Sequence, residues 1–157
     1  MKNKKFNFCT VAGTASYKGN FNHFSKDAYN LNHQNLNLSS IGFGMYKGKY
    51  GKRERINYQK IIKNFILNGV NVFDTARKYR SGYSEEDFGI VFLKLIKNKK
   101  IYRDQIYISS KAGLINFNPK KNKIVQLELL VKERGINKSD IKNQIFCGNP
   151  KFLNQEI

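Results

Sequence analysis

The chain has 157 residues and carries 29 Lys and Arg against 11 Asp and Glu, a formal net charge of +18. Its 40% hydrophobic residues, including 12 Phe and 9 Tyr, argue against wholesale disorder, because that much apolar mass supports a buried core. The two cysteines, Cys9 and Cys147, have no C-x-x-C spacing, which argues against a disulfide framework and against a zinc site built with His23 and His33. We expect two free thiols and no metal.

The positive charge alone does not define a partner. Clustered Lys and Arg bind nucleic-acid phosphates, but here the lysines run along the whole chain and greatly outnumber the arginines, which suit phosphate and base recognition better. The positive charge is therefore weak support for nucleic-acid binding. Residues 1–5 are basic but no continuous apolar run follows them, and no apolar run is long enough to span a bilayer. We expect a cytoplasmic protein with no signal peptide and no membrane partner.

The first half of the chain predicts an extension, a strand and a helix. Residues 1–38 are polar, rich in Asn and without clear periodicity, and we interpret them as an N-terminal extension of a domain formed by residues 39–157. Residues 38–46 are typical of a strand that opens into a glycine-rich loop. Asn57 is the predicted cap of the next helix, whose apolar residues repeat at helical spacing, and Gly69 is its predicted exit.

Two further strands and a second helix follow. Residues 70–73 predict a strand that ends at Asp74, and residues 105–110 predict another. Between them, Ser84 precedes three acidic residues, as expected at a helix start, where a hydroxyl caps free amides and the helix dipole favours negative charge. This alternation of strands and helices predicts an α/β fold with a parallel sheet, built from about three βα units.

The pattern loosens beyond the third predicted strand. Residues 127–134 predict a short helix that Gly135 ends. Asn149 followed by Pro150 predicts the start of one more helix, close to the last residue of the sequence. Because an isolated first turn is barely stable, we expect the sequence to be that of a truncated protein.

Asp74, Tyr79 and Lys111 lie at or just beyond predicted strand ends, where (β/α) folds place their catalytic groups. Reduction of a carbonyl needs a hydride at carbon and a proton at oxygen. Tyrosine is a weak acid, with an ordinary pKa of about 10, and it releases its proton more readily beside a lysine ammonium. A carboxylate keeps that ammonium charged and in place. The three side chains together therefore suit proton donation to a carbonyl oxygen.

Each of the three residues also has an ordinary interpretation. Asp74 could satisfy backbone amides at a turn, Tyr79 could be one of the 9 tyrosines, and Lys111 could be a solvated lysine. Their joint placement favours the chemical interpretation, because small residues beside Asp74 and Lys111 leave space for a ligand.

These segments resemble the aldo-keto reductase family. Four motifs carry the resemblance: Ser40-Ile41-Gly42-Phe43-Gly44-Met45-Tyr46, Asn71-Val72-Phe73-Asp74-Thr75-Ala76-x-x-Tyr79, Ser84-Glu85-x-x-Phe88-Gly89 and Ser109-Ser110-Lys111. The N-terminal lead, with Ala12-Gly13-Thr14 and Tyr17, and the segment Phe146-Cys147-Gly148-Asn149-Pro150 resemble a bacterial-type branch of the family, so the resemblance covers nearly the whole chain. It implies a partial (β/α)8 TIM barrel, holding about the first three βα units after an N-terminal extension. It also implies an NADP(H)-dependent oxidoreductase that reduces aldehydes and ketones, its small-molecule carbonyl substrates, to alcohols.

The same resemblance implies roles for individual residues. Tyr79 would be the general acid, Lys111 the ammonium that eases release of its proton, and Asp74 the carboxylate paired with Lys111. The residues expected to lie against the cofactor are Gly44, Met45, Tyr46 and Asp74.

The sequence departs from the family pattern in two ways. The family commonly has Thr in place of Met45 and Asn in place of Lys78, and Arg77 with Lys78 puts two cations beside the proposed acid. The family's catalytic histidine and its phosphate-binding loops would lie beyond Ile157, so we expect an N-terminal fragment that is inactive as an isolated chain. The alternatives are a non-catalytic interaction fragment that needs a complementing C-terminal chain and, third, a basic nucleic-acid-binding protein.

Overall fold

The computed structural model describes residues 8–115, 117, 121–143 and 146–154. Two compact units are present, Met1–Ser110 and Lys111–Ile157. No helix formed by the described residues is both long and apolar enough to cross a membrane.

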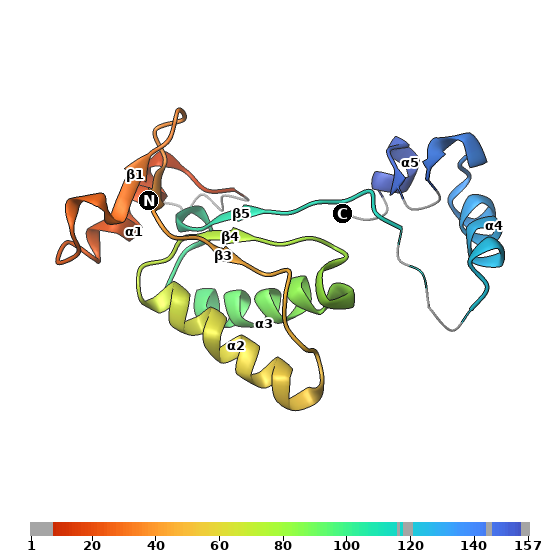
Figure 1. Ribbon diagram of the computed structural model, residues 1–157. Coiled ribbons are helices and arrows are strands. Elements are labelled where there is room, and N and C mark those ends of the chain that lie inside the picture. Colours follow the sequence, from red (N-terminus) through yellow and green to blue (C-terminus); the bar gives the residue numbers. More distant parts are fainter. Residues whose placement is uncertain (1–7, 116, 118–120, 144–145, 155–157) are drawn as a thin grey trace. The chain divides into compact units, whose positions relative to one another are not determined.

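The first unit is built on a three-stranded parallel sheet with the order β3 (Phe43–Gly44), β4 (Val72–Asp74) and β5 (Tyr107–Ser109). Two helices, α2 (Lys52–Leu67) and α3 (Tyr83–Lys97), lie along one face of this sheet (Figure 1). Each helix connects one parallel strand to the next, as in successive βα units. The predicted α/β class and parallel sheet are therefore confirmed, and the arrangement is that of part of a (β/α)8 barrel.

Apolar residues at helical spacing bury the facing sides of α2 and α3 against the sheet. Four-residue steps place Tyr58, Ile62 and Ile66 on the buried side of α2. The buried side of α3 carries Phe88, Val91, Phe92 and Leu95. Phe73 of β4 is fully buried between sheet and helices, and its ring lies 5.1 Å from that of Phe88. This core fixes the three strands so that their carboxyl ends come to the same edge.

The N-terminal segment is more ordered than its sequence suggests. It forms α1 (Val11–Gly19), the 3₁₀ helix η1 (Lys26–Ala28) and an antiparallel hairpin of β1 (Tyr29–Leu31) and β2 (Asn37–Ser39). None of these elements except part of β2 was expected from hydrophobic periodicity, and the predicted domain boundary at residue 38 stays a prediction.

Buried hydroxyl groups tie this segment to the loop between α2 and β4. The Tyr17 hydroxyl donates to the Val70 carbonyl at 3.0 Å, and the Tyr29 hydroxyl donates to the Gly69 carbonyl at 2.6 Å. The Asn71 side chain accepts from the Ser39 amide at 2.8 Å and donates to the Asn37 carbonyl at 2.9 Å. These long-range contacts order a segment that lacks a strong local pattern.

Ionisation of the two buried tyrosines is expected to loosen this attachment at high pH. Burial raises the pKa of Tyr17 above its usual value and raises the pKa of Tyr29 to about 12. An unfolded tyrosine ionises near pH 10, so between pH 10 and 12 the unfolded chain loses protons that the folded chain keeps. The free energy of unfolding should therefore hold below about pH 10 and fall above it.

Urea unfolding of the wild type and of Tyr29→Phe between pH 9 and about 12 measures this effect. Tyr29→Phe should start less stable, because it loses one hydrogen bond, and should then decline less steeply as the pH rises. Tyr50→Phe is the matched control, since the Tyr50 ring is half exposed. If the free energy of unfolding falls equally steeply with pH in the wild type and in Tyr29→Phe, the expected effect of the buried Tyr29 hydroxyl is contradicted.

Several predicted boundaries are wrong by a few residues. Residues 38–46 form two strands, because β2 pairs with β1 while β3 pairs with β4. Helix α2 begins at Lys52, after Gly51, so Asn57 lies inside the helix and caps nothing. Helix α3 begins at Tyr83, after Gly82, and no side chain caps it. The predicted exit of α2 at Gly69 is confirmed by its left-handed φ of +93°.

The second unit contains α4 (Lys123–Arg134), η4 (Lys138–Asp140), the antiparallel pair β6 (Ile141–Lys142) and β7 (Phe146–Cys147), and α5 (Pro150–Leu153). Gly135 ends α4 in the left-handed conformation, as predicted. Asn149 caps α5 by accepting from the Lys151 amide at 2.8 Å, with Pro150 at the first helical position, which confirms that prediction too. The small core of the second unit consists of Ile115, Ile136, Cys147 and Phe152.

Candidate active site

The candidate site begins where β4 ends. In the sheet register Asp74 lies opposite Gly44 of β3 on one side and opposite Ser109 of β5 on the other. The ladder continues one residue further, because the Met45 amide donates to the Asp74 carbonyl at 2.9 Å and the Thr75 amide donates to the Ser109 carbonyl at 2.8 Å. Asp74 is thus held from both sides at the carboxyl edge of the sheet.

Tyr79 follows on the loop that leaves β4 and opens the short helix η2 (Tyr79–Gly82). Its amide donates to the Ala76 carbonyl at 3.0 Å, which folds the loop back toward the strand end. The Tyr79 ring meets the ring of Tyr46 edge to face, with centroids 5.0 Å apart. Tyr46 lies two residues beyond β3 and is 65% exposed. The structure therefore brings the loops after β3 and β4 into contact through two tyrosines.

A buried charge cluster holds the chain immediately after Tyr79. The Asp87 carboxylate on α3 is fully buried and accepts from Arg80 at 3.0 Å, from Arg55 at 2.9 Å and from Gln59 at 2.8 Å. The Arg80 guanidinium also lies over the ring of Tyr58, 3.6 Å from its centroid. Two cations and one amide thus satisfy a carboxylate that would otherwise be costly to bury.

Arg80 also links the two loops that carry the tyrosines. Its Nη2 donates to the Lys49 carbonyl at 2.9 Å, on the loop between β3 and α2. Arg80 and Ser81 are both left-handed, with φ of 49° and 60°, a conformation that costs side-chain-bearing residues about 1–2 kcal/mol each. The buried contacts of Arg80 stabilise this conformation and so fix the path of the Tyr79 loop.

Sequence reasoning missed this cluster, although one signal for it was present. Asp87 precedes Phe88 and lies four residues before Val91, which places a charged residue on the buried side of α3. A charged residue at a core position needs a partner of opposite charge. The partner could not be read from the sequence, because Arg80 reaches Asp87 only through the left-handed turn.

The residues expected against the cofactor are not equally exposed. A Cβ placed on Gly44 would meet nothing within 4 Å, so the surface above it is open. The Tyr46 side chain is exposed beside it, whereas Met45 is fully buried in the core. The Ser84 hydroxyl donates to the Met45 carbonyl at 2.7 Å. Ser84 therefore contacts the chain after β3 and does not form the predicted cap of α3. The Met45 side chain therefore belongs to the core, and Gly44 and Tyr46 present the accessible surface.

Lys111 is the first residue of the second unit, and its side chain is exposed. Its position relative to Asp74 and Tyr79 stays a prediction, resting on its place two residues after the end of β5. Among the described residues, no three His, Cys, Asp or Glu side chains gather as a metal site requires.

The fold and the strand-end residues define a parallel α/β protein that carries Asp74 at the end of its second parallel strand and Tyr79 on the loop after it. The sequence model of the aldo/keto reductase family matches residues 40–140, which include both residues, all three parallel strands and Lys111. The chain belongs to this family.

Individual relatives match over only part of their length. A putative aryl-alcohol dehydrogenase of Schizosaccharomyces pombe is 35% identical over 96 residues, which are 61% of this chain and 25% of that protein. The chain thus spans about a quarter of the length of this curated relative. A thermostable aldo-keto reductase solved with the inhibitor epalrestat is 20% identical, with a TM-score of 0.45 over 69% of this chain and 39% of that one. The holo form of an aldo-keto reductase from Bacillus halodurans is 23% identical, with a TM-score of 0.43 over 69% and 36%.

Proposed function

We propose that this chain carries the first part of the active site of an NADPH-dependent carbonyl reductase. The observation that carries the proposal is the placement of Asp74 at the end of one parallel strand and of Tyr79 on the loop after it, with the Tyr79 ring against Tyr46 after the neighbouring strand. This is the edge of a (β/α) sheet at which substrates and cofactors bind. Membership of the aldo/keto reductase family supplies the reaction class.

In the proposed reaction, the Tyr79 hydroxyl donates its proton to the carbonyl oxygen as the carbonyl carbon becomes an alcohol carbon. Lys111 supplies the positive charge that eases release of this proton, and the Asp74 carboxylate keeps Lys111 charged and in place. The buried Arg80–Asp87 pair keeps the Tyr79 loop in its conformation. The substrate class is aldehydes and ketones.

The accessible residues fit the reacting end of a nicotinamide cofactor. Gly44 leaves open surface at the end of β3, and Tyr46 presents an aromatic ring beside it. Arg77 and Lys78 add two exposed cations on the Tyr79 loop, which suit a phosphorylated ligand. NADPH supplies the hydride when bound. The preference for NADPH over NADH, which lacks the additional phosphate, is taken from the family. Met45 supports this surface from the core and does not line it.

A chimera tests the proposal, in which residues 1–157 are joined to the remaining barrel of a full-length family member. Aldehyde-dependent oxidation of NADPH should appear in the chimera. The 157-residue polypeptide alone should show no such oxidation. Its only two histidines, His23 and His33, precede β3, so neither can replace the family's catalytic histidine, which is expected further along the barrel. A chimera that folds by circular dichroism and binds NADPH, but oxidises none of it with any aldehyde or ketone, would overturn the proposal.

A further inference from the structure

A groove runs between α2 and α3, separate from the candidate active site. Its volume is about 360 Å³. The floor is apolar and is formed by Ile56 and Leu67 of α2 and by Ile90, Val91 and Leu95 of α3. Ile56 is 49% exposed and Ile90 is 46% exposed. Large apolar side chains that line one concave surface are typical of a binding site for another molecule.

Four lysines surround this apolar floor. Lys60 and Lys63 project from α2, Lys94 projects from α3, and Lys100 follows α3, and all four are exposed. None of the described residues that line the groove is acidic. Among the described residues that line it, the groove therefore carries four positive charges and no carboxylate.

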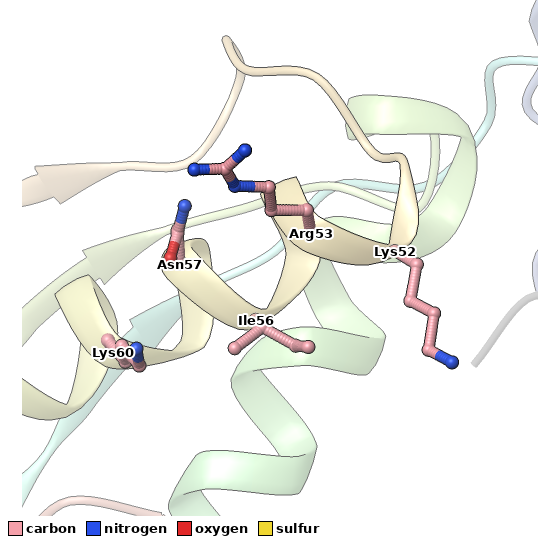
Figure 2. Close-up of a pocket in the computed structure, with 5 residues that line it drawn as sticks. All are labelled: Lys52, Arg53, Ile56, Asn57 and Lys60. Carbon is pink, nitrogen blue, oxygen red and sulfur yellow. The ribbon is translucent and has the colours of Figure 1, made fainter.

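A second hollow on α2 extends this surface toward the N-terminal end of the helix. It shares Ile56 and Lys60 with the groove and adds Lys52, Arg53 and Asn57 (Figure 2). Figure 2 shows Ile56 between the basic side chains Lys52 and Lys60 along the helix. The second hollow therefore adds two cations, but no further apolar side chain, at the N-terminal end of α2.

We propose that this groove, defined by the five apolar and four lysine residues above, docks an acidic amphipathic helix of a partner protein. A helix laid in a groove inserts one apolar stripe, with anchors three to four residues apart, and this stripe fits the apolar floor. Asp and Glu on either side of the stripe then meet the lysine rim, so that shape and charge select the same ligand.

Two other occupants fit the groove less well. A second copy of the chain would bring two molecules of net charge +18 together, and they repel one another. Nucleic-acid backbone would be attracted by the cations but has no apolar stripe for the floor. Its recognition also favours arginine, and the cations that line the groove are all lysines.

Peptide binding to the full 157-residue chain tests the proposal, followed by fluorescence anisotropy at about physiological salt. The probe is a labelled peptide of about six helical turns with a leucine stripe flanked by glutamates. Its control has the same composition in an order that puts the leucines on no single face. The striped peptide should bind at least about tenfold more tightly, a difference of roughly 1.4 kcal/mol.

Charge reversals locate the binding site. Lys60→Glu with Lys63→Glu should weaken binding of the striped peptide about tenfold or more. Lys26→Glu with Lys121→Glu makes the same change in net charge at exposed positions outside the groove, and should change the affinity less than about threefold. Ile90→Ser, which alters only the apolar floor, should weaken the striped peptide and leave the scrambled peptide unaffected.

Three results would overturn the proposal. Equal binding of the two peptides would mean that charge alone attracts them. If the two pairs of charge reversals weaken binding of the striped peptide equally, the groove is not its binding site. Duplex DNA or anionic vesicles that displace the striped peptide, and that lose affinity in the Lys60→Glu, Lys63→Glu variant, would assign the groove to a different class of partner.

Discussion

Replacement of Tyr79 by Phe in the chimera is expected to lower kcat for aldehyde reduction by about 10²–10⁴-fold, the usual contribution of a positioned general acid. The substitution removes the proton donor and keeps the ring, so the edge-to-face contact with Tyr46 at 5.0 Å should persist. In the proposed reaction the hydroxyl acts on the carbonyl oxygen of the substrate, so the dissociation constant of NADPH should stay close to that of the unsubstituted chimera. Steady-state kinetics and cofactor titration measure the two quantities separately.

Tyr50→Phe is the control for this substitution. Tyr50 is also a tyrosine near the strand ends, but its ring is 50% exposed and stacks on Tyr83. Loss of its hydroxyl should change kcat less than about twofold. Similar losses in Tyr79→Phe and Tyr50→Phe, or retained activity in Tyr79→Phe, would remove Tyr79 from the role of general acid.

Replacement of Asp87 by Ala is expected to destabilise the first unit strongly. It leaves the Arg80 guanidinium, with a side chain 1% exposed, buried without its carboxylate. Breaking a buried ion pair in this way costs about 3–5 kcal/mol, a large share of the roughly 5–15 kcal/mol that holds a small domain folded. The urea midpoint should therefore fall strongly, with little change in the slope.

Glu86→Ala is the matched control on the same helix. Glu86 pairs with Arg55 at 2.7 Å but is 54% exposed, and exposed ion pairs contribute about 0–1 kcal/mol. A small effect for Glu86→Ala and a large one for Asp87→Ala would confirm that burial makes the difference. Equal effects of the two substitutions would mean that the Asp87 cluster does not stabilise the Tyr79 loop as described.

The sequence was sufficient to predict the features that follow from local pattern. The apolar spacing of α2 and α3, the strand that ends at Asp74 and the cap formed by Asn149 are each determined by neighbouring residues, and each is present. The family could be recognised because its motif residues keep fixed offsets along the chain, such as the five residues from Asp74 to Tyr79.

Features that depend on distant partners could not be predicted. Helix α1 buries only Gly13, Thr14 and Tyr17, too few residues for an apolar period to show, and it is held by contacts such as that of Tyr17 with Val70. The burial of Met45 could not be predicted for the same reason, because its side chain packs in a core made by later helices.

A double-substitution cycle in the chimera tests whether Tyr79 and Lys111 act as one catalytic unit. Tyr79→Phe, Lys111→Met and the two together are compared by kcat/KM for one aldehyde. If Lys111 acts through the proton of Tyr79, the double variant should be no slower than the slower single variant, because either change removes the same function. If the two losses multiply instead, Lys111 does not act through Tyr79, and the site proposed at the carboxyl ends of β4 and β5 is wrong.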